Sequence, residues 1–364
     1  MNLLFTLVGI FYLLNGIFYL IGIRRSRNAQ SKSHVELFDY PFVTVIVPAR
    51  DEAAVIESCL DALLNQDYPR EQFEVLLVND RSADSTGKII AAYANQHPGT
   101  ITPVQLSGAF GGKGLAIDTG VKLARGDIIL TTDADVRVNP NWIRTIAEQF
   151  QPATGLVFGP TMYRYNNKLV QRYQALETAF LSVVSSGYVA NEFPVTCQGS
   201  NMAFRKETYQ EIRDKLVKRN FPDTNDDLIL QEVSLLERWK IRTVLTSGAI
   251  NYTDPPETWL TLMNQRFRWA SHGRLYPRIS VRIYLILLFS SLLGFAAGPF
   301  VLPVNQVITL WGLKLMVDFS VALEVTSAIR DRKLLKAFPL VFLLQPFIVV
   351  VSGIFGTLGL FRWK

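Results

Sequence analysis

Short apolar runs alternate with amphipathic segments through the middle of the chain. The runs Phe42–Ala49, Phe73–Asp80 and Asp127–Val136 are rich in β-branched residues and predict strands. Helical spacing of apolar residues in Glu52–Gln66 and in Gly112–Gly126 predicts helices between them. This alternation, at roughly 30 residues per unit, is typical of an α/β fold with a mostly parallel sheet and helices on both faces.

A long uncharged run opens the chain. Met1–Ile23 contains no charged residue, and at about 1.5 Å per helical residue it can cross a hydrocarbon core of about 30 Å. The basic stretch Arg24–Arg27 follows the run, whereas a cleaved signal peptide carries its positive charge before the apolar segment. We therefore expect a retained transmembrane anchor.

Three more candidate spans lie near the carboxyl end: Ile283–Pro303, Val304–Val325 and Ala337–Phe361. The second contains Lys314 and Asp318, which are four residues apart and face the same side of a helix. Such a pair either marks an intramembrane polar site, or it neutralises itself at a helix interface or belongs to a re-entrant segment, and the second interpretation is favoured.

Basic segments indicate the orientation of these spans. Arg24–Arg27 and Arg330–Lys336 favour the cytoplasmic side. Four spans place both segments on that side with the two termini outside, and three spans would separate them. The expected organisation is an anchor (residues 1–23), a basic linker (24–40), a cytoplasmic catalytic domain with interfacial helices (41–280) and a membrane region of about three spans (281–364), in a plasma or inner membrane.

Composition agrees with a membrane protein. Hydrophobic residues make up 49% of the 364 residues, and the mean hydropathy is +0.19. Two cysteines are too few for a disulfide scaffold, and with three histidines they provide no zinc-ligand spacing. The formal charge of +6 is a mild excess, and we expect no nucleic-acid partner.

Carboxylates follow three of the predicted strands: Glu52, Asp80, and the pair Asp133 and Asp135. The carboxyl ends of parallel strands share one edge of a sheet, where ligands bind. No GxGxxG follows the first strand and no GxxxxGK[ST] is present, which disfavours a dinucleotide fold and a P-loop. A carboxylate-rimmed pocket without a phosphate-cradling loop needs a cation before it can hold a phosphate. The pattern therefore predicts Mg²⁺ or Mn²⁺ together with a nucleotide.

Six stretches in order resemble glycosyltransferase family 2, which has the GT-A nucleotide-diphospho-sugar transferase fold. They are "VPARDE" (Val47–Glu52), "VNDRSADST" (Val78–Thr86), "GGKGLA" (Gly111–Ala116), "TTDADV" (Thr131–Val136), "TNDD" (Thr224–Asp227) and "QRFRW" (Gln265–Trp269). The resemblance covers about residues 40 to 280. Ceramide glucosyltransferases and cellulose- and hyaluronan-type synthases share the last motif.

The resemblance implies roles at the donor. Asp80 meets the uracil base and Glu52 the nucleoside, while Lys113 lies near the nucleotide. Asp133 lies near the ribose and beside the metal, and Asp135 binds the metal that bridges the diphosphate.

The resemblance also implies a general base, Asp226. Asn225 stands where the family often has Glu, and Asp227 follows at once, so the choice between Asp226 and Asp227 stays open.

Further residues are assigned to the donor and acceptor by the resemblance. Gln265 and Arg268 contact the donor, with Arg268 on the diphosphate, and Trp269 lies near the acceptor. Gly199 and Asn201, in "QGSN", lie outside the resembling motifs and are expected on the acceptor side.

The chemistry of sugar transfer makes three demands that do not depend on the resemblance. A positively charged group must neutralise the negative charge of the leaving diphosphate, a base must accept the proton of the acceptor hydroxyl, and a surface must hold the acceptor in line with the anomeric carbon. One base and no evident carboxylate nucleophile suit a single displacement, which inverts the anomeric carbon.

Each motif in isolation has an ordinary interpretation as a turn, helix cap or surface charge, and only their joint occurrence favours an enzyme. Cys59 is expected in the core. Cys197, beside "QGSN", either lines the acceptor side or is a packed thiol, and the second interpretation is favoured. His272 is a further candidate for substrate contact. The segment Leu169–Val189 is either an interfacial helix or an amphipathic helix packed on the sheet.

The expected activity is transfer of a sugar, from UDP or another nucleoside diphosphate, to a membrane lipid or lipid-linked glycan. One alternative is a processive polysaccharide synthase, although four spans make a poor channel for a hydrated glycan unless the chain forms a homo-oligomer. Another alternative is a catalytically silent scaffold that only binds a nucleotide sugar.

Overall fold

The computed structural model describes residues 3–31, 39–108, 111–218 and 226–361. The chain divides into two compact units, each built from separate segments. The sheet unit comprises Asn28–Met162 and Pro194–Asp254, and the membrane-helix unit comprises Met1–Arg27, Tyr163–Phe193 and Pro255–Lys364. The predicted segmentation into anchor, linker, catalytic domain and membrane region stays a prediction.

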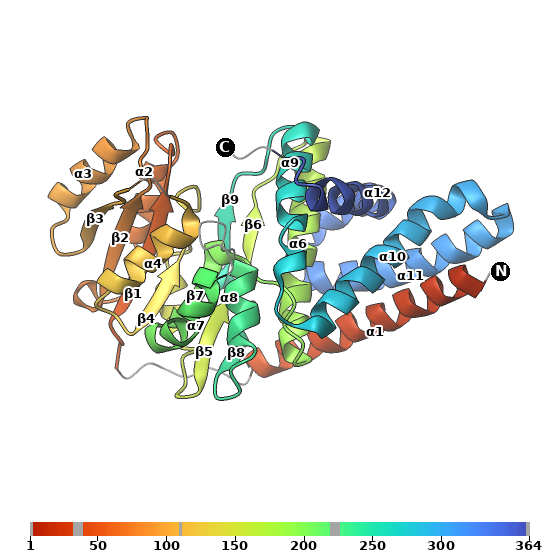
Figure 1. The fold of residues 1–364 in the computed structure, drawn as a ribbon, viewed down its shortest axis with the longest axis horizontal. Helices are drawn as coiled ribbons and strands as arrows, with labels where there is room; N and C mark the ends of the chain where they lie inside the picture. The colour runs from red at the N-terminus through yellow and green to blue at the C-terminus, as the bar shows by residue number, and fades with distance from the viewer. Residues whose placement is uncertain (1–2, 32–38, 109–110, 219–225, 362–364) are drawn as a thin grey trace. The chain divides into compact units, whose positions relative to one another are not determined.

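The sheet unit contains a seven-stranded sheet in the order β3-β2-β1-β4-β7-β5-β8 (Figure 1). Only β7 runs antiparallel to its neighbours, so the sheet is mostly parallel, as predicted. The strands are β1 (Val43–Ala49), β2 (Phe73–Asn79), β3 (Ile101–Gln105), β4 (Ile128–Thr131), β5 (Thr154–Phe158), β7 (Met202–Arg205) and β8 (Lys240–Thr243). A separate two-stranded sheet pairs β6 (Thr161–Tyr163) with β9 (Asn251–Thr253).

Helices cover both faces of the large sheet. Side chains of a strand alternate between the two faces, and because they are apolar on both, each face is buried under helices. Val45 and Val47 of β1 belong to the same buried cluster as Leu60 and Trp142. Ile46 points the other way, against Gly120. The helices of this unit are α2 (Ile56–Leu64), α3 (Thr86–Gln96), α4 (Lys113–Leu123), α5 (Trp142–Ala147), α7 (Lys206–Lys218) and α8 (Asp226–Val233).

The membrane-helix unit consists of long apolar helices and shorter ones that pack on them. They are α1 (Leu3–Ser31, whose last residues belong to the sheet unit), α6 (Leu169–Ala190), α9 (Trp259–Ala270), α10 (Ile279–Val301), α11 (Val304–Ala328), the 3₁₀ helix η6 (Arg332–Ala337) and α12 (Phe338–Thr357). Within this unit α6 packs against η6, α11 and α12, which favours the interfacial interpretation of residues 169–189.

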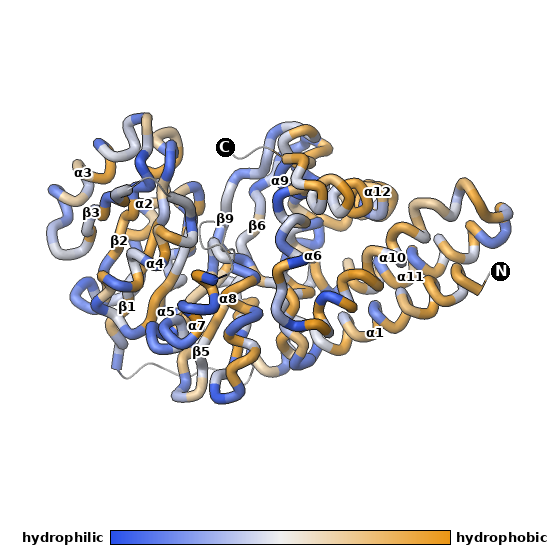
Figure 2. The backbone as a smooth tube through the Cα atoms, in the orientation of Figure 1, coloured by the Kyte–Doolittle hydropathy of each residue, from blue (hydrophilic) through white to orange (hydrophobic). Residues whose placement is uncertain are grey.

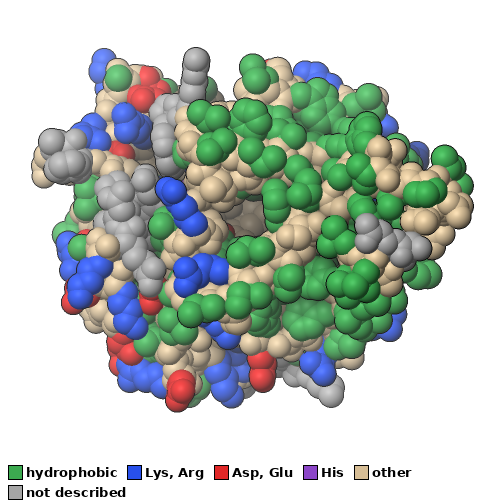
Figure 3. All heavy atoms as spheres, turned by 45° about the vertical axis from the view of Figure 1, so that its right-hand side comes forward, with side chains coloured by type: hydrophobic (Ala, Val, Ile, Leu, Met, Phe, Trp, Pro, Cys, Tyr) green, Lys and Arg blue, Asp and Glu red, His purple; other side chains and the backbone are tan. Residues whose placement is uncertain are grey.

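Among the described residues, four helical segments are long and apolar enough to cross a membrane: Leu3–Gln30, Ile279–Val301, Val304–Ala328 and Arg332–Thr357. Figure 2 shows hydrophobic residues dominating along α1, α10, α11 and α12. Large apolar side chains remain exposed on all four helices, and Figure 3 shows apolar side chains gathered on this part of the molecule. The expectation of four spans rather than three is confirmed as far as length and composition decide it, and their orientation stays a prediction.

Lys314 and Asp318 of α11 form the pair that their spacing predicted. Lys314 is fully buried and also donates to the carbonyl of Phe342 (3.2 Å). Tyr12 of α1 donates to the second carboxylate oxygen of Asp318 (2.6 Å). The favoured interpretation, a self-neutralising pair at a helix interface, is confirmed.

Candidate active site

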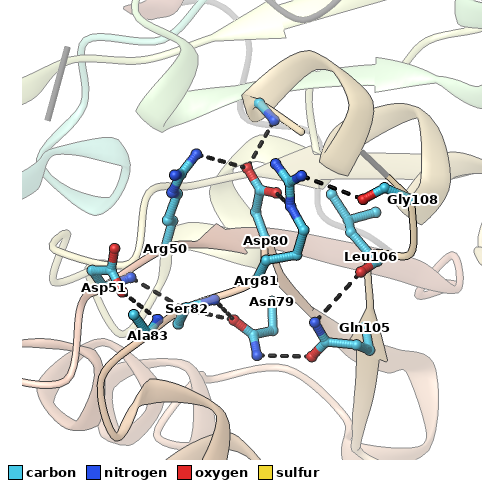
Figure 4. Close-up of polar contacts among 11 residues, drawn as sticks. Arg50, Asp51, Asn79, Asp80, Arg81, Ser82, Ala83, Gln105, Leu106 and Gly108 are labelled. Atoms are coloured by element: carbon cyan, nitrogen blue, oxygen red, sulfur yellow. Dashed lines mark hydrogen bonds and ion pairs between the residues drawn. The ribbon is translucent and has the colours of Figure 1, made fainter. Parts of the chain in front are cut away.

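The loops after β1 and β2 hold each other in place. The carboxylate of Asp51 accepts from the backbone N–H of Ala83 (2.7 Å), and the hydroxyl of Ser82 accepts from the backbone N–H of Asp51 (3.1 Å). Asp51 and Arg81 both have left-handed backbone conformations, with φ of 55° and 56°. Such conformations cost energy in residues other than glycine and persist where neighbours enforce them. Figure 4 shows these reciprocal contacts.

Asp80 lies at the centre of this arrangement, directly after β2. Its side chain is buried and accepts from the backbone N–H of Gly112 (2.7 Å) and from Nε of Arg81 (3.1 Å), while Arg50 lies 3.9 Å away (Figure 4). A Cβ added to Gly111 would lie 2.2 Å from the Asp80 carboxylate, so only glycine permits this approach. The structure thus holds Asp80 rigidly, and its contact with a uracil base stays a prediction.

Lys113, the first residue of α4, joins two of the predicted carboxylates. Its ammonium lies 2.7 Å from Asp133 and 3.7 Å from Asp226. All three side chains are partly exposed, by 33%, 38% and 22%. We call these residues the Lys113 cluster. It brings together three residues that are far apart in sequence, and all three side chains are accessible to solvent.

Asp226 opens α8, where the helix dipole favours a carboxylate. Its Oδ2 accepts from the backbone N–H of Gly199 (2.8 Å). A Cβ at Gly199 would overlap the carboxylate of Asp226, at 1.6 Å from its Cγ. The structure therefore gives Gly199 a definite role, which is to let Asp226 approach the backbone, and its assignment to the acceptor stays a prediction.

Asp227 is held differently from its neighbour. Its Oδ1 accepts from the hydroxyl of Thr196 (2.8 Å) and from the backbone N–H of Cys197 (2.9 Å). Burial raises the pKa of the Cys197 thiol well above its ordinary value, and the charges of Asp227 and Asp226 add to the effect. The Cys197 thiol is therefore protonated at neutral pH, but the residue is partly exposed, so its expected packed position stays a prediction. Asn225, where the sequence departs from the family pattern, lies outside the described residues.

The two acids Asp133 and Asp135 lie just beyond the end of β4. Asp135 is exposed and Asp133 is partly exposed. The Cys59 thiol is buried beneath them and donates to the carbonyl of Asp133 (3.6 Å). Its pKa is raised by burial first, and then by the charges of Asp135 and Asp133. The core position of Cys59 is confirmed.

Glu52, partly buried after β1, donates its backbone N–H to the hydroxyl of Thr86 (2.8 Å).

Asn201 is fully buried. Its amide oxygen accepts from the indole N–H of Trp142 (2.8 Å), and its amide nitrogen donates to the carbonyls of Pro160 (2.8 Å) and Ala249 (2.7 Å). Both of its N–H groups are therefore used inside the protein. A direct contact of Asn201 with an acceptor stays a prediction.

The "QRFRW" residues belong to α9 in the membrane-helix unit. Gln265 accepts from the hydroxyl of Tyr163 (3.2 Å), and Trp269 is 39% exposed. The buried Arg266 ion-pairs with Glu177 of α6 and stacks on the Trp269 ring at 4.1 Å. Sequence reasoning missed Arg266, which positions the tryptophan. The signal that could have found it is its partner Glu177, the single acidic residue of α6.

Arg268 lies on the same helix and is partly buried, and His272 just beyond the helix is 7% exposed. The proposed contacts of Gln265, Arg268, Trp269 and His272 with donor or acceptor stay predictions.

Comparison with protein families matches residues 44–227 to the family described as glycosyl transferase family 2. The match covers half of the chain.

The chain belongs to glycosyl transferase family 2.

The chain is also similar to glycosyltransferases of several kinds. The chain is 29% identical over 241 residues to the probable glycosyltransferase YdaM of Bacillus subtilis, covering 64% of this chain and 55% of the relative. It is 26% identical over 243 residues to the β-monoglucosyldiacylglycerol synthase of Trichormus variabilis, covering 64% and 49%. It is 22% identical over 321 residues to a poly-β-1,6-N-acetyl-D-glucosamine synthase of Staphylococcus epidermidis, covering 86% and 72%. The first two matches span only about half of the relatives' own length.

Comparison with solved structures confirms the fold. The mannosyltransferase PcManGT from Pyrobaculum calidifontis, in complex with GDP-Man and Mn²⁺, aligns with a TM-score of 0.56 and 20% identity. The alignment covers 94% of this chain and 99% of that chain. The predicted GT-A fold and family membership are both confirmed.

The acids of this family 2 domain fit a divalent cation held jointly with a substrate. Among the described residues, no group of three or more His, Cys, Asp or Glu side chains converges into a complete protein cage. Asp133 and Asp135 provide hard oxygen ligands at the end of β4. Mg²⁺ typically binds through one or two carboxylates, with substrate phosphates and waters completing its shell. These two residues fit that mode.

Proposed function

We propose that the chain transfers a sugar from a nucleotide-diphosphate donor, with inversion, to a membrane lipid or lipid-linked acceptor. The observation that supports this most is the Lys113 cluster in a family 2 domain, in which a cation lies between a carboxylate of the β4 end and the candidate base. The proposed donor is a UDP-sugar, and the proposed cofactor is Mg²⁺ or Mn²⁺, held by Asp135 and Asp133. When bound, the metal neutralises charge on the diphosphate.

The proposed reaction is a single displacement at the anomeric carbon, with one carboxylate as the base. The acceptor hydroxyl oxygen forms a bond to the anomeric carbon while the bond from that carbon to the diphosphate oxygen breaks. The hydroxyl proton passes to a carboxylate, and the diphosphate leaves with the electron pair. We assign the base to Asp226 rather than Asp227, since Asp226 lies beside Lys113 while Asp227 is tied to Thr196 and the backbone of Cys197. General base catalysis of this kind contributes roughly 10²–10⁴-fold.

Two observations favour a lipid acceptor. Four helices are apolar and long enough to span a membrane, and a β-monoglucosyldiacylglycerol synthase is among the relatives. A poly-N-acetylglucosamine synthase is also a relative and matches more of the chain, so polysaccharide synthesis is the second candidate function. Location of the catalytic domain on the cytoplasmic side, where nucleotide sugars are made, belongs to the same proposal.

The test is release of nucleoside diphosphate by the full chain in lipid nanodiscs. UDP-glucose, UDP-galactose, UDP-N-acetylglucosamine and GDP-mannose are supplied in turn with Mn²⁺ or Mg²⁺, with and without membrane lipid extract. We expect lipid-stimulated, metal-dependent release that Asp226→Asn and Asp135→Ala each lower by at least 100-fold, on the scale of a lost catalytic group. Asp214→Asn, at an exposed position in α7, removes the same charge and leaves release unchanged.

The size of the product separates the two candidate functions, because a single glycolipid and a polymer differ in mass. Full activity in Asp226→Asn with loss in Asp227→Asn would move the base to Asp227. Absence of release from every donor, with nucleotide binding intact, would contradict catalysis and support the scaffold alternative.

A further inference from the structure

A basic cavity lies in the membrane-helix unit, on segments that the sugar-transfer chemistry does not use. It has a volume of about 220 Å³. Arg172 of α6 and Lys333 and Lys336 of η6 line it. Among the described residues, no acceptor lies within hydrogen-bonding distance of either lysine ammonium, and both side chains are exposed. The cavity is therefore cationic, and two of its charges are available to a ligand.

The N-terminus of α6 also meets this cavity, because Asn167, which lines it, lies just before that helix. At the start of α12, by contrast, the N–H of Phe338 donates to the carbonyl of Leu335, and Pro339 has no N–H. The first N–H groups of a helix have no partner inside it and carry partial positive charge, so they favour an anion. In the cavity this effect adds to the three cationic side chains.

One carboxylate near the cavity is already engaged. Asp331 accepts from the hydroxyl of Tyr165 (2.8 Å) and from the backbone N–H of Lys333 (3.1 Å). The first of these bonds joins the segment before α6 to η6, and so holds the two sides of the cavity together. Burial, with the Asp331 contact, raises the pKa of Tyr165 to about 12, so its hydroxyl remains a donor at neutral pH.

The cavity lies at one end of the candidate spans. The helix η6 connects α11 to α12, where both helices reach the same surface of the bundle. The basic end of α1 reaches that surface too, because Arg24 and Arg27 ion-pair with Glu324 in the last turns of α11 (3.1 and 2.9 Å). Cations gathered where membrane helices end attract anionic headgroups.

We infer that this cavity binds the phosphate of an anionic phospholipid headgroup, at a site separate from the residues assigned to sugar transfer. Lys333, Lys336 and Arg172 supply the charge, and the N-terminus of α6 supplies backbone donors. The acyl chains would lie along the apolar helices, where exposed side chains such as Leu343 of α12 are available. The headgroup phosphate and a free phosphate share the same recognition chemistry, and the experiment below separates them.

The experiment measures lipid binding by native mass spectrometry of the full chain released from detergent micelles. The probes are dioctanoyl phosphatidylglycerol and dioctanoyl phosphatidylcholine, with glycerol 1-phosphate as a soluble competitor. We expect the wild type to prefer phosphatidylglycerol. Lys333→Gln/Lys336→Gln should weaken that binding by on the order of tenfold or more, because each cation near an anionic lipid contributes a several-fold factor. Lys333→Arg/Lys336→Arg should retain it.

The matched control is Lys88→Gln/Lys240→Gln, which removes two exposed lysines of the sheet unit and the same total charge. It should leave binding unchanged, and Arg172→Gln should weaken it. Equal binding to the wild type and to Lys333→Gln/Lys336→Gln would overturn the inference, as would an equal loss in the control. Displacement of the lipid by an equal concentration of glycerol 1-phosphate would also overturn it, since the ligand would then be a free phosphate. The readout needs no turnover, so it is independent of the sugar-transfer proposal.

Discussion

Two lysine–aspartate pairs in this chain carry the same charges in opposite surroundings. Lys113 and Asp133 of the sheet unit are 2.7 Å apart, and about a third of each side chain is exposed. Lys314 of the membrane-helix unit is fully buried, and its partner Asp318 is 15% exposed. Aromatic rings surround the buried ammonium at 4.7–6.0 Å, from Tyr12, Phe295, Trp311 and Phe342.

The difference shows which pair is available to a ligand. A partly exposed pair contributes little to stability, and solvent can give way to a substrate beside it. A buried pair has lost the hydration of both charges, and it is tolerated only where further hydrogen bonds satisfy it. Lys314 and Asp318 have these bonds, to Phe342 and Tyr12. The first pair is thus suited to binding and the second to holding α1, α11 and α12 together.

The largest expected effect is on the buried pair. Lys314→Ala leaves the Asp318 charge without its partner and should lower the free energy of unfolding by about 3–5 kcal/mol. Lys314→Met/Asp318→Leu removes both charges and should recover most of this loss. The measurement is the unfolding free energy from SDS titration in bicelles. A single variant as stable as the wild type would show that the pair does not hold the helices.

The next largest effect concerns the geometry of the Lys113 cluster. Gly199→Ala places a Cβ within 1.6 Å of the Asp226 Cγ and must displace this carboxylate. Because a misplacement of about 1 Å can cost about 100-fold, kcat for nucleotide release should fall by that order. Gly312→Ala is the matched control, since a Cβ there meets no atom within 4 Å. Unchanged kcat in Gly199→Ala would remove Asp226 from the catalytic machinery.

A smaller effect is expected from the partly exposed pair of Lys113 and Asp133. Lys113→Gln should lower kcat/KM by roughly tenfold to a hundredfold, since hydrogen bonds to charged groups contribute about 1.5–3 kcal/mol. The unfolding free energy should change by less than about 1 kcal/mol, because the pair is partly exposed. Steady-state kinetics and thermal unfolding are measured together, with Lys88→Gln as the control for lost charge. A large loss of stability without a kinetic change would show that the Lys113 pair stabilises the fold and does not bind substrate.

The smallest effect comes from an exposed carboxylate outside both pairs. The pKa of Asp84 is lowered because its carboxylate accepts hydrogen bonds from the hydroxyl and the backbone of Thr86, and from the backbone of Ala53. A carboxyl with a lowered folded-state pKa stabilises the fold above its unfolded pKa of about 3.9, and this contribution is lost as the pH falls through the folded-state pKa. The Tm difference between wild type and Asp84→Asn should therefore be present at pH 7 and disappear in strong acid. A difference that persists in acid would assign the effect to neutral hydrogen bonding.

Local patterns predicted the secondary structure closely where a short apolar run is buried at every position. The run Phe73–Asp80 predicted β2, which spans Phe73–Asn79. Element ends were less accurate, because they depend on distant partners. The helix expected over Glu52–Gln66 begins only at Ile56, since the residues before it form the loop that hydrogen bonds to residues 82–86. The strand expected over Asp127–Val136 ends at Thr131, and the acids follow it in a turn.

By itself, the sequence determined the class of fold, four long apolar segments and the order of the acidic motifs, which follow from composition and spacing within short stretches. The family was indicated by the resemblance of six motifs to known members. Only the tertiary structure decided that β7 inserts antiparallel between β4 and β5, and that Asp226 approaches a glycine while Asp227 is tied to Thr196. It also paired Tyr12 with Asp318, 306 residues away. Such contacts depend on how distant segments pack, and the periodicity of one segment carries no information about the side chain that another segment will bring to it.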